Sequence, residues 1–260
     1  RTLVFNPSDS TQAPRLFNQR NSQDNYADPG DFVTKRNQFQ LNTLDLTDDN
    51  LYMIGEGFTP EGKFPFVDQY KISDFTKKRW YQCKETNRLE QIISAIDIKK
   101  GQFLTRLESK TSYPNYYIRN LKNNDLRQIT HNVNPFKVLD DVHKEIIKYK
   151  REDGVDLSAT LYLPVGYDKT KKEKLPMIMW AYPTEFKDKA SAGQVTSNAN
   201  EFTFPFYGSP LYWLTKGYVV LDDAAFPIVG EGDKEPNDTF IPQLVSNAKA
   251  AIDEIGRAHV

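Results

Sequence analysis

Two apolar stretches decide the fold of this chain: LPMIMWAYPTEF (residues 175–186) and LTKGYVVLDDAAFPIVGEGDKE (residues 214–235). Each opens as a short run without charged residues, residues 177–180 in the first and residues 218–221 in the second. Short apolar runs followed by irregular, helix-like stretches are typical of parallel strands covered on both faces. We therefore predict two buried strands in one such sheet.

Ligands of a parallel sheet bind beyond the carboxyl ends of its strands, here residues 182–185 and 222–230. Tyr182 stands out among them, because hydrolases place part of the oxyanion hole just past this strand. Its successor Pro183 has no N–H, so a phenolic hydroxyl would have to replace a backbone donor. On position alone, an oxyanion donor and a tyrosine that only covers a strand end fit Tyr182 equally well.

The sequence does not contain a hydrolytic triad in the required order. No G-x-S-x-G occurs, so there is no nucleophilic serine on a sharp strand-to-helix turn. An α/β-hydrolase places its histidine after the serine and the acid, whereas His131 and His143 precede both predicted strands and His259 lies in the last residues. We interpret His131 and His143 as structural or surface residues. The single Cys83 is interpreted as a buried strand residue rather than a nucleophile.

Composition argues against several classes of function. The 260 residues include 34 basic and 35 acidic side chains and carry a net charge of −1, which gives no electrostatic footprint for nucleic acid or a membrane surface. No apolar stretch approaches the roughly 20 residues of a membrane helix. C-x-x-C and H-E-x-x-H are absent, and the G-E-G motifs at residues 55–57 and 230–232 lack the further glycine of a phosphate-binding loop. We expect neither a metal nor a cofactor.

The first half of the chain contains a weak internal repeat. QYKISDFTKKRWYQC (residues 69–83) aligns with NYYIRNLKNNDLRQI (residues 115–129), so that Tyr116 matches the tyrosine 46 positions earlier. Each copy reads as strand, charged turn and strand, and follows another alternating stretch (residues 51–54 and 103–107). A period of 40–50 residues with about four short strands is typical of propeller blades. Two unrelated hairpins are the alternative.

The second half opens with a predicted hairpin and ends with a predicted helix. Strands at residues 145–150 and 157–163 flank the turn Glu152-Asp153-Gly154. Apolar residues at helical spacing over residues 239–254 predict a helix with Asp238 as its N-cap.

The two ends of the chain are expected to be breaks in a longer protein. The sequence begins at Arg1 rather than at Met. The last residues, EIGRAHV (254–260), match the in-frame translation of a common short-read sequencing adapter, which predicts a non-native tail. A native helix end with Gly256 as its cap is the alternative.

The order of these elements resembles the prolyl oligopeptidase family of serine peptidases. The strings MWAYPTEFKDKASAGQV, NEF, PIVGEGDKEPND and QLV, which begin at residues 179, 200, 227 and 243, are most similar to its glutamyl endopeptidase branch. The resemblance implies that Tyr182 donates to the tetrahedral oxyanion and that the nucleophile, acid and histidine lie outside this sequence. It also implies cleavage after acidic residues.

We therefore predict the C-terminal blades of a β-propeller (all-β, partial) at residues 1–137, followed by the N-terminal half of an α/β-hydrolase domain at residues 138–253. The intact protein would cleave a peptide substrate through an acyl-enzyme, with the propeller limiting access, and this chain by itself would be inactive. An esterase or acylaminoacyl hydrolase of the same fold is one alternative. A non-catalytic scaffold or binding module is the other.

Overall fold

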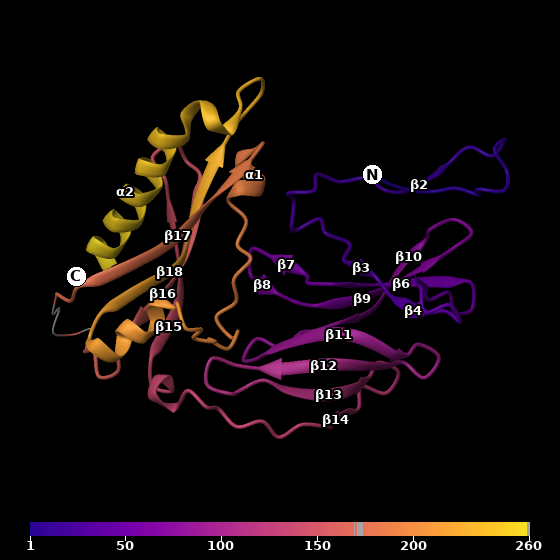
Figure 1. Ribbon diagram of the computed structural model, residues 1–260, viewed down its shortest axis with the longest axis horizontal. Helices are drawn as coiled ribbons and strands as arrows, with labels where there is room; N and C mark the ends of the chain where they lie inside the picture. The colour runs from indigo at the N-terminus through magenta and orange to yellow at the C-terminus, as the bar shows by residue number, and fades with distance from the viewer. Residues whose placement is uncertain (169, 171–173, 259–260) are drawn as a thin grey trace.

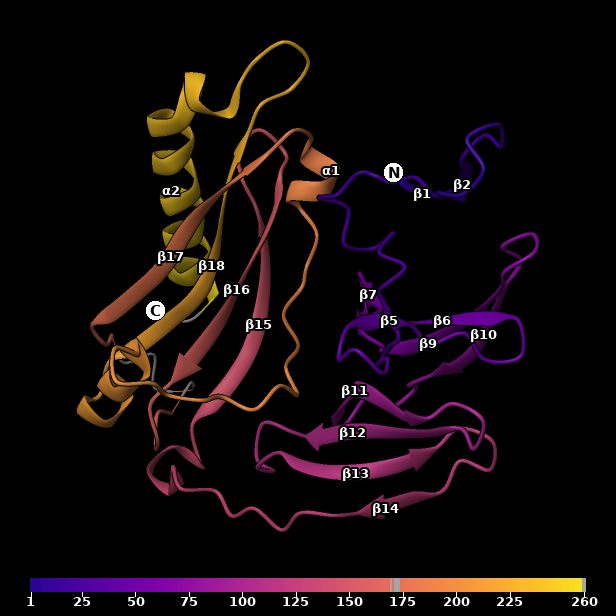
Figure 2. The same cartoon turned by 45° about the vertical axis from the view of Figure 1, so that its right-hand side comes forward.

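The computed structural model describes residues 1–168, 170 and 174–258, which form two regions joined through η1 (Lys137–Leu139) (Figure 1). The N-terminal region consists of antiparallel sheets, and the C-terminal region is a twisted four-stranded sheet. Helix α2 (Phe240–Ala258) runs along one face of that sheet. In both cartoon views residues 193–209 descend between the two regions (Figure 2).

Two four-stranded antiparallel meanders make up most of the N-terminal region. The first contains β3 (Asp31–Phe32), β6 (Asn50–Gly55), β9 (Phe66–Lys71) and β10 (Lys77–Gln82). The second contains β11 (Leu89–Asp97), β12 (Gln102–Glu108), β13 (Asn115–Asn120) and β14 (Leu126–Gln128). The sequence repeat falls on the third and fourth strands of each meander. The repeat therefore marks two matching four-stranded units, as in propeller blades, rather than two unrelated hairpins.

The two meanders share an apolar core. Along β12 the alternate residues Phe103 and Leu107 are buried, which is the period of two that places them on one face of the sheet. Trp80 of the first meander packs between two rings, with centroids 5.3 Å from Tyr52 and 5.8 Å from Phe103 of the second meander. Aromatic contacts of this length add to the burial of apolar area, so they hold the two units face to face.

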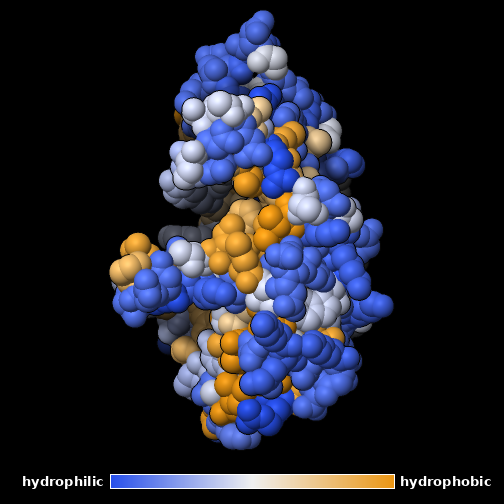
Figure 3. Space-filling view, turned by 90° about the vertical axis from the view of Figure 1, so that its right-hand side faces the viewer, coloured by the Kyte–Doolittle hydropathy of each residue, from blue (hydrophilic) through white to orange (hydrophobic). Residues whose placement is uncertain are grey.

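Three two-stranded hairpins complete the N-terminal region. They are β1 (Thr2–Val4) with β2 (Arg15–Asn18), β4 (Thr34–Arg36) with β5 (Asn42–Leu44), and β7 (Phe58–Thr59) with β8 (Gly62–Lys63). Exposed apolar side chains such as Leu3, Leu16 and Leu44 come from these hairpins. The outer end of the region shows apolar side chains among polar ones (Figure 3). The sheets of this region are open and do not close into a ring.

The C-terminal sheet has the order β15 (His143–Lys150), β16 (Asp156–Leu163), β18 (Val219–Val229) and β17 (Met177–Phe186). The predicted hairpin is confirmed: β15 pairs antiparallel with β16, and Gly154 takes the positive φ of 87° that the turn requires. The predicted parallel pair is confirmed as β17 and β18.

Burial differs between the two strands of the parallel pair. Leu221 of β18 packs toward α2 and Val220 toward η2 (Pro210–Lys216), and both are fully buried. The expectation of a buried strand is wrong for β17, where Trp180 is 54% exposed. Among the described strands β17 pairs with β18 alone, so it is an edge strand with one side uncovered.

Both strands also extend further than expected, because a bulge interrupts their pairing without ending it. Met179 is opposite Leu221 and Ala181 is opposite Ala224, so two residues of β18 face one residue of β17. Asp223 takes a φ of 49° within this bulge, which bends the strand and increases its twist. Pairing then resumes to the end of β17, so the positions expected to follow the strands lie inside them.

The entry into α2 differs from the prediction. The turn η3 (Pro236–Thr239) precedes the helix, and its N-cap is Glu235. The Asp238 carboxylate accepts a hydrogen bond from the Glu235 N–H at 3.1 Å, so Asp238 is the third residue of a capping box and not the N-cap. At the other end the helix continues through Gly256, which therefore does not cap it.

The apolar stripe predicted for this helix divides between two faces. Ala251 is fully buried, and Leu244 and Ala248 pack against the same core. Ile241, Val245 and Ile252 are more than half exposed. The buried face is therefore narrower than the sequence pattern indicates.

Candidate functional site

Tyr182 lies on β17 just beyond the bulge, opposite Ala225 of β18. Its side chain is 84% exposed, and no described residue forms a hydrogen bond with its hydroxyl. A phenolic hydroxyl in this setting can donate to a ligand without first breaking a bond to the protein. An exposed ring also covers little of the strand beneath it.

Pro183 follows on the free edge of the strand. The carbonyl of Phe186 accepts a hydrogen bond from Gly230 on the side of β18, so the alternate residues Pro183 and Glu185 direct their backbone groups to the opposite side. Proline is tolerated there because its missing N–H is not needed for pairing with β18. The backbone at Pro183 can accept a hydrogen bond but cannot donate one.

A polar cluster that sequence analysis missed lies at the bulge and at the contact between the two regions. Asp222 is half-buried opposite Thr160 of β16, and this burial raises the pKa of its carboxyl. Lys144 of β15 donates from Nζ to the carbonyl oxygen of Glu201 at 2.6 Å, and burial lowers the pKa of this amine. These residues come from segments far apart in the sequence, and no local pattern indicates their contact.

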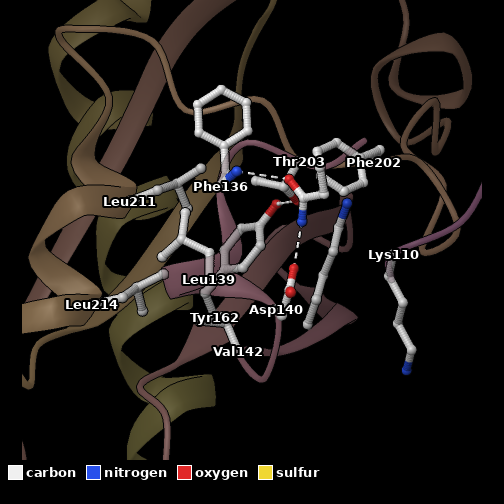
Figure 4. Close-up of a pocket in the computed structure, with 12 residues that line it drawn as sticks. Lys110, Phe136, Leu139, Asp140, Val142, Tyr162, Phe202, Thr203, Leu211 and Leu214 are labelled. Carbon is white, nitrogen blue, oxygen red and sulfur yellow. Dashed lines mark hydrogen bonds between the residues drawn. The ribbon is translucent and has the colours of Figure 1, made fainter. Parts of the chain in front are cut away.

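A small cavity opens beside this cluster, where the link between the regions meets the sheet (Figure 4). Its lining includes Leu139, Tyr162, Phe202 and Leu214, and the Tyr162 hydroxyl lies 3.0 Å from the Thr203 hydroxyl. The cavity volume is about 30 Å³, which holds about one water molecule. It is too small for a peptide.

Larger hollows lie elsewhere, one at the boundary of the two regions and one within the N-terminal region. One of about 550 Å³ is lined by Tyr26 and Pro60 from the N-terminal region and by Lys148 and Gln194 from the C-terminal region. A second, of about 630 Å³, lies at the end of the second meander and includes Tyr113 among its lining residues. Both are within the size range of ligand sites, and the first lies at the boundary of the two regions.

Neither of the two histidines that the structure describes lies beside Tyr182. His143 begins β15, the edge strand at the opposite side of the sheet, where its Nε2 lies 3.3 Å from Oε2 of Glu145. His131 follows β14 in the N-terminal region, and His259 lies outside the described residues. Cys83 is buried one residue past β10, and burial raises the pKa of its thiol.

The described residues contain neither a candidate metal centre nor a helix suited to cross a membrane. Three or more His, Cys, Asp or Glu side chains do not gather there in an arrangement that would hold a metal ion. In the same part of the chain, no helix has the length and apolar character that crossing a membrane requires.

Comparison with known proteins supplies close relatives, although no family model matches the chain. The whole chain is 38% identical over 273 residues to a protein of Oryza sativa subsp. japonica named "Probable glutamyl endopeptidase, chloroplastic". It is 37% identical over 274 residues to a protein of the same name from Arabidopsis thaliana. The chain spans 29% and 28% of the lengths of these relatives.

Among solved structures, oligopeptidase B from Leishmania major has a similar fold. The TM-score is 0.51 at 10% identity, and the match covers 85% of this chain and 30% of that one. At this identity the likeness concerns the fold.

Proposed function

Because the chain belongs to the prolyl oligopeptidase family, we propose that it is part of a serine-type peptidase that cleaves peptides through an acyl-enzyme. Residues 1–137 would supply the C-terminal blades of its propeller, and residues 138–253 the N-terminal half of its α/β-hydrolase domain. Residues 254–260 would be a non-native tail. The serine, acid and histidine of the triad would lie outside this sequence.

The exposed hydroxyl of Tyr182 is the observation that carries the proposal. Tyr182 lies on β17, the third strand of the sheet in chain order, near the end where α/β-hydrolases build part of the oxyanion hole. Its hydroxyl is open to a ligand, and the following Pro183 rules out the backbone donor that would otherwise serve there. A donor aimed at the developing negative charge stabilises the transition state more than the bound substrate.

The sheet order supports the α/β-hydrolase assignment. An antiparallel hairpin, β15–β16, leads into the parallel pair β18–β17, and α2 covers one face of the parallel part. Helices packed on a sheet with parallel strands are the architecture in which ligands meet the strand ends. The name of the plant relatives favours an acidic residue before the scissile bond. A peptide series that differs only in Glu or Gln at that position tests this preference.

The oxyanion role of Tyr182 is tested by Tyr182→Phe in the full-length protein. We expect kcat to fall by about 10²–10³-fold, the range for losing one such donor, with little change in KM. The melting temperature should not change, because the ring remains and the hydroxyl has no described partner to lose. Tyr207→Phe is the matched control, since Tyr207 is also fully exposed. An unchanged kcat in Tyr182→Phe would refute the role.

The 260-residue chain by itself is expected to have no peptidase activity. It contains no G-x-S-x-G, and loss of the nucleophile costs several orders of magnitude in rate. A fluorophosphonate probe, which labels activated serines, should leave it unmodified. Stoichiometric labelling at any serine would contradict this expectation.

A further inference from the structure

A loop of the N-terminal region lies against the end of the strand that carries Tyr182. Residues 20–28 reach from β2 toward α1 (Lys189–Ala192), and both cartoon views place this loop beside that short helix. Its side chains and backbone form hydrogen bonds with residues more than 160 positions later in the sequence. The contact therefore joins the two regions directly at the candidate site.

Gln23 takes the place of a neighbouring strand on the free edge of β17. Its Nε2 donates to the carbonyl oxygen of Glu185 at 2.7 Å, and its Oε1 accepts from the backbone N–H of Lys187 at 3.0 Å. These backbone groups point away from β18, because the intervening Phe186 carbonyl accepts from Gly230 on the other side. One side-chain amide thus satisfies a donor and an acceptor that the edge strand would otherwise leave to water.

Gln194 makes the reciprocal contact. Its Oε1 accepts from the backbone N–H groups of Asn25 at 2.7 Å and Tyr26 at 3.3 Å, and its Nε2 donates to Asp24 at 2.7 Å. That last hydrogen bond is the main cause of the lowered pKa of the Asp24 carboxyl. The Tyr26 hydroxyl in turn accepts from the backbone N–H of Val195 at 2.9 Å.

Asn21 adds a third contact at the start of α1. Its Nδ2 donates to the Asp188 carboxylate at 2.9 Å, the same group that caps the short helix by accepting from the Ser191 N–H at 2.7 Å. The loop therefore holds the segment after Tyr182 at three successive places, namely the strand end, the helix start and the residues after the helix.

We propose that Gln23 and Gln194 are positioning residues for Tyr182, forming a clasp through which the N-terminal region fixes the end of β17. The proposal rests on the oxyanion role proposed for Tyr182. Beyond the bulge, β17 has a strand partner on one side, and the clasp supplies the other side three residues after Tyr182. Separation of the two regions would break the clasp, so the position of the Tyr182 hydroxyl depends on their contact.

The first test measures the clasp itself by amide hydrogen exchange on this chain. In Gln23→Ala the N–H of Lys187 loses its acceptor, so we expect it to exchange at least 10-fold faster. The amides of Val220 and Leu221 in the sheet core should not change. Gln12→Ala is the matched control, because Gln12 is an exposed glutamine of the same region outside these contacts. An unchanged Lys187 exchange rate would overturn the clasp.

A second variant guards against local misfolding of the loop. Gln194→Ala alters the opposite side of the contact, and we expect faster exchange of the Asn25 amide by a similar factor. The Tyr26 amide should change less, because it keeps a 3.1 Å hydrogen bond to the Asp24 carboxylate. If only the Gln23 variant responds, the two side chains do not act as one clasp and the proposal fails.

The positioning role is tested by kinetics on the full-length protein. Gln23→Ala should lower kcat by about 10-fold or more with a smaller change in KM, because small displacements of a transition-state donor cost rate. Adding Tyr182→Phe to Gln23→Ala should lower kcat little further, because the hydroxyl that Gln23 positions is then no longer present. Faster exchange of the Lys187 amide in Gln23→Ala with an unchanged kcat would overturn the positioning role. The role would also be overturned if the fold-losses in kcat of the two single variants multiply in the double variant. An unchanged kcat in Tyr182→Phe alone would instead refute the oxyanion role, while Lys187 exchange still reports on the clasp.

Discussion

The N-terminal and C-terminal regions surround their buried charges with different partners. In the N-terminal region Glu90 of β11 is fully buried and accepts two hydrogen bonds from Arg119 of β13, each 2.8 Å long. A third, also 2.8 Å, comes from the Tyr81 hydroxyl of the other meander. The opposite charges compensate each other, and the tyrosine extends the network across the two meanders.

In the C-terminal region a buried arginine is satisfied mainly by neutral groups. Arg151 donates to the carbonyl oxygen of Pro227 at 2.9 Å, to the Asn247 side chain at 2.8 Å and to the Gln243 side chain at 3.1 Å. Among the described residues its carboxylate partner is Asp153, which accepts two hydrogen bonds of 2.8 and 3.0 Å and has a side chain that is 44% exposed. Arg151 thereby connects the β15–β16 turn to β18 and α2 at once.

This difference determines how much stability each region loses when one partner of its buried charge is removed. A buried carboxylate without its arginine is an uncompensated charge in a medium that solvates it poorly. Carbonyl and amide groups without their arginine can still bond with each other, and an exposed carboxylate can turn to water. The N-terminal network should therefore be the more sensitive of the two.

The sharpest test is Arg119→Met. This change leaves Glu90 buried and unpaired, so we expect the free energy of unfolding to fall by about 3–5 kcal/mol. The double variant Glu90→Leu, Arg119→Met should cost less than the single one, because it removes both charges. Arg88→Met is the control, since Arg88 pairs with Glu85 at the surface and should cost less than about 1 kcal/mol. Urea denaturation measures all three, and equal losses for Arg119 and Arg88 would refute the argument.

Arg151→Met should lower the free energy of unfolding by less than Arg119→Met does. The Asn247 side chain still donates to the Pro227 carbonyl at 3.0 Å, and Gln243 still brackets the backbone of Val229 with two hydrogen bonds of 2.9 Å. We expect a loss of about 1–3 kcal/mol, the cost of leaving neutral groups imperfectly satisfied. The same denaturation series measures it. A loss as large as that of Arg119→Met would mean that the two networks do not differ.

Elements specified by local sequence could be predicted. The β15–β16 hairpin follows from a turn that ends in Gly154, and the repeat located corresponding strands of both meanders because strand and turn residues recur at similar spacing. The parallel pairing of β17 and β18 followed from two short apolar runs with a long connection between them.

Features that depend on distant neighbours could not be predicted. The apolar runs of β17 and β18 look alike in sequence. Only the order of strands in the sheet makes β17 an edge strand and β18 a central strand. The bulge opposite Trp180 has no local signal, so the strands were predicted to end too early. The side chains that meet across the regions, such as Gln23 and Lys144, belong to polar segments whose partners lie far away in the sequence. For Tyr182 the sequence predicted a place just past the third strand, whereas the structure places it within β17 and shows its exposure.

The smallest effect concerns pH, where one carboxyl from each region should respond in opposite directions. The hydrogen bond from Arg151 lowers the pKa of Asp153 below its ordinary 3.8, so its stabilising contribution is complete above the unfolded pKa and is lost as pH falls through the folded value. Burial raises the pKa of Glu108, in the second meander, above its ordinary 4.5. Its protonated form is favoured in the folded state, so stability is lost as pH rises through the folded pKa.

Melting temperatures of wild type, Asp153→Asn and Glu108→Gln between pH 7 and pH 3 separate these two signs. Relative to Asp153→Asn, the wild type should lose its advantage as the pH falls through the lowered pKa of Asp153, below the ordinary 3.8. Relative to Glu108→Gln, the wild type should gain as the pH falls through the raised pKa of Glu108, above the ordinary 4.5, because protonation removes a charge that burial disfavours. Because neither variant can titrate at its altered position, each difference isolates one carboxyl. Shifts of the same sign for both variants would mean that these two carboxyls do not respond to pH in opposite directions.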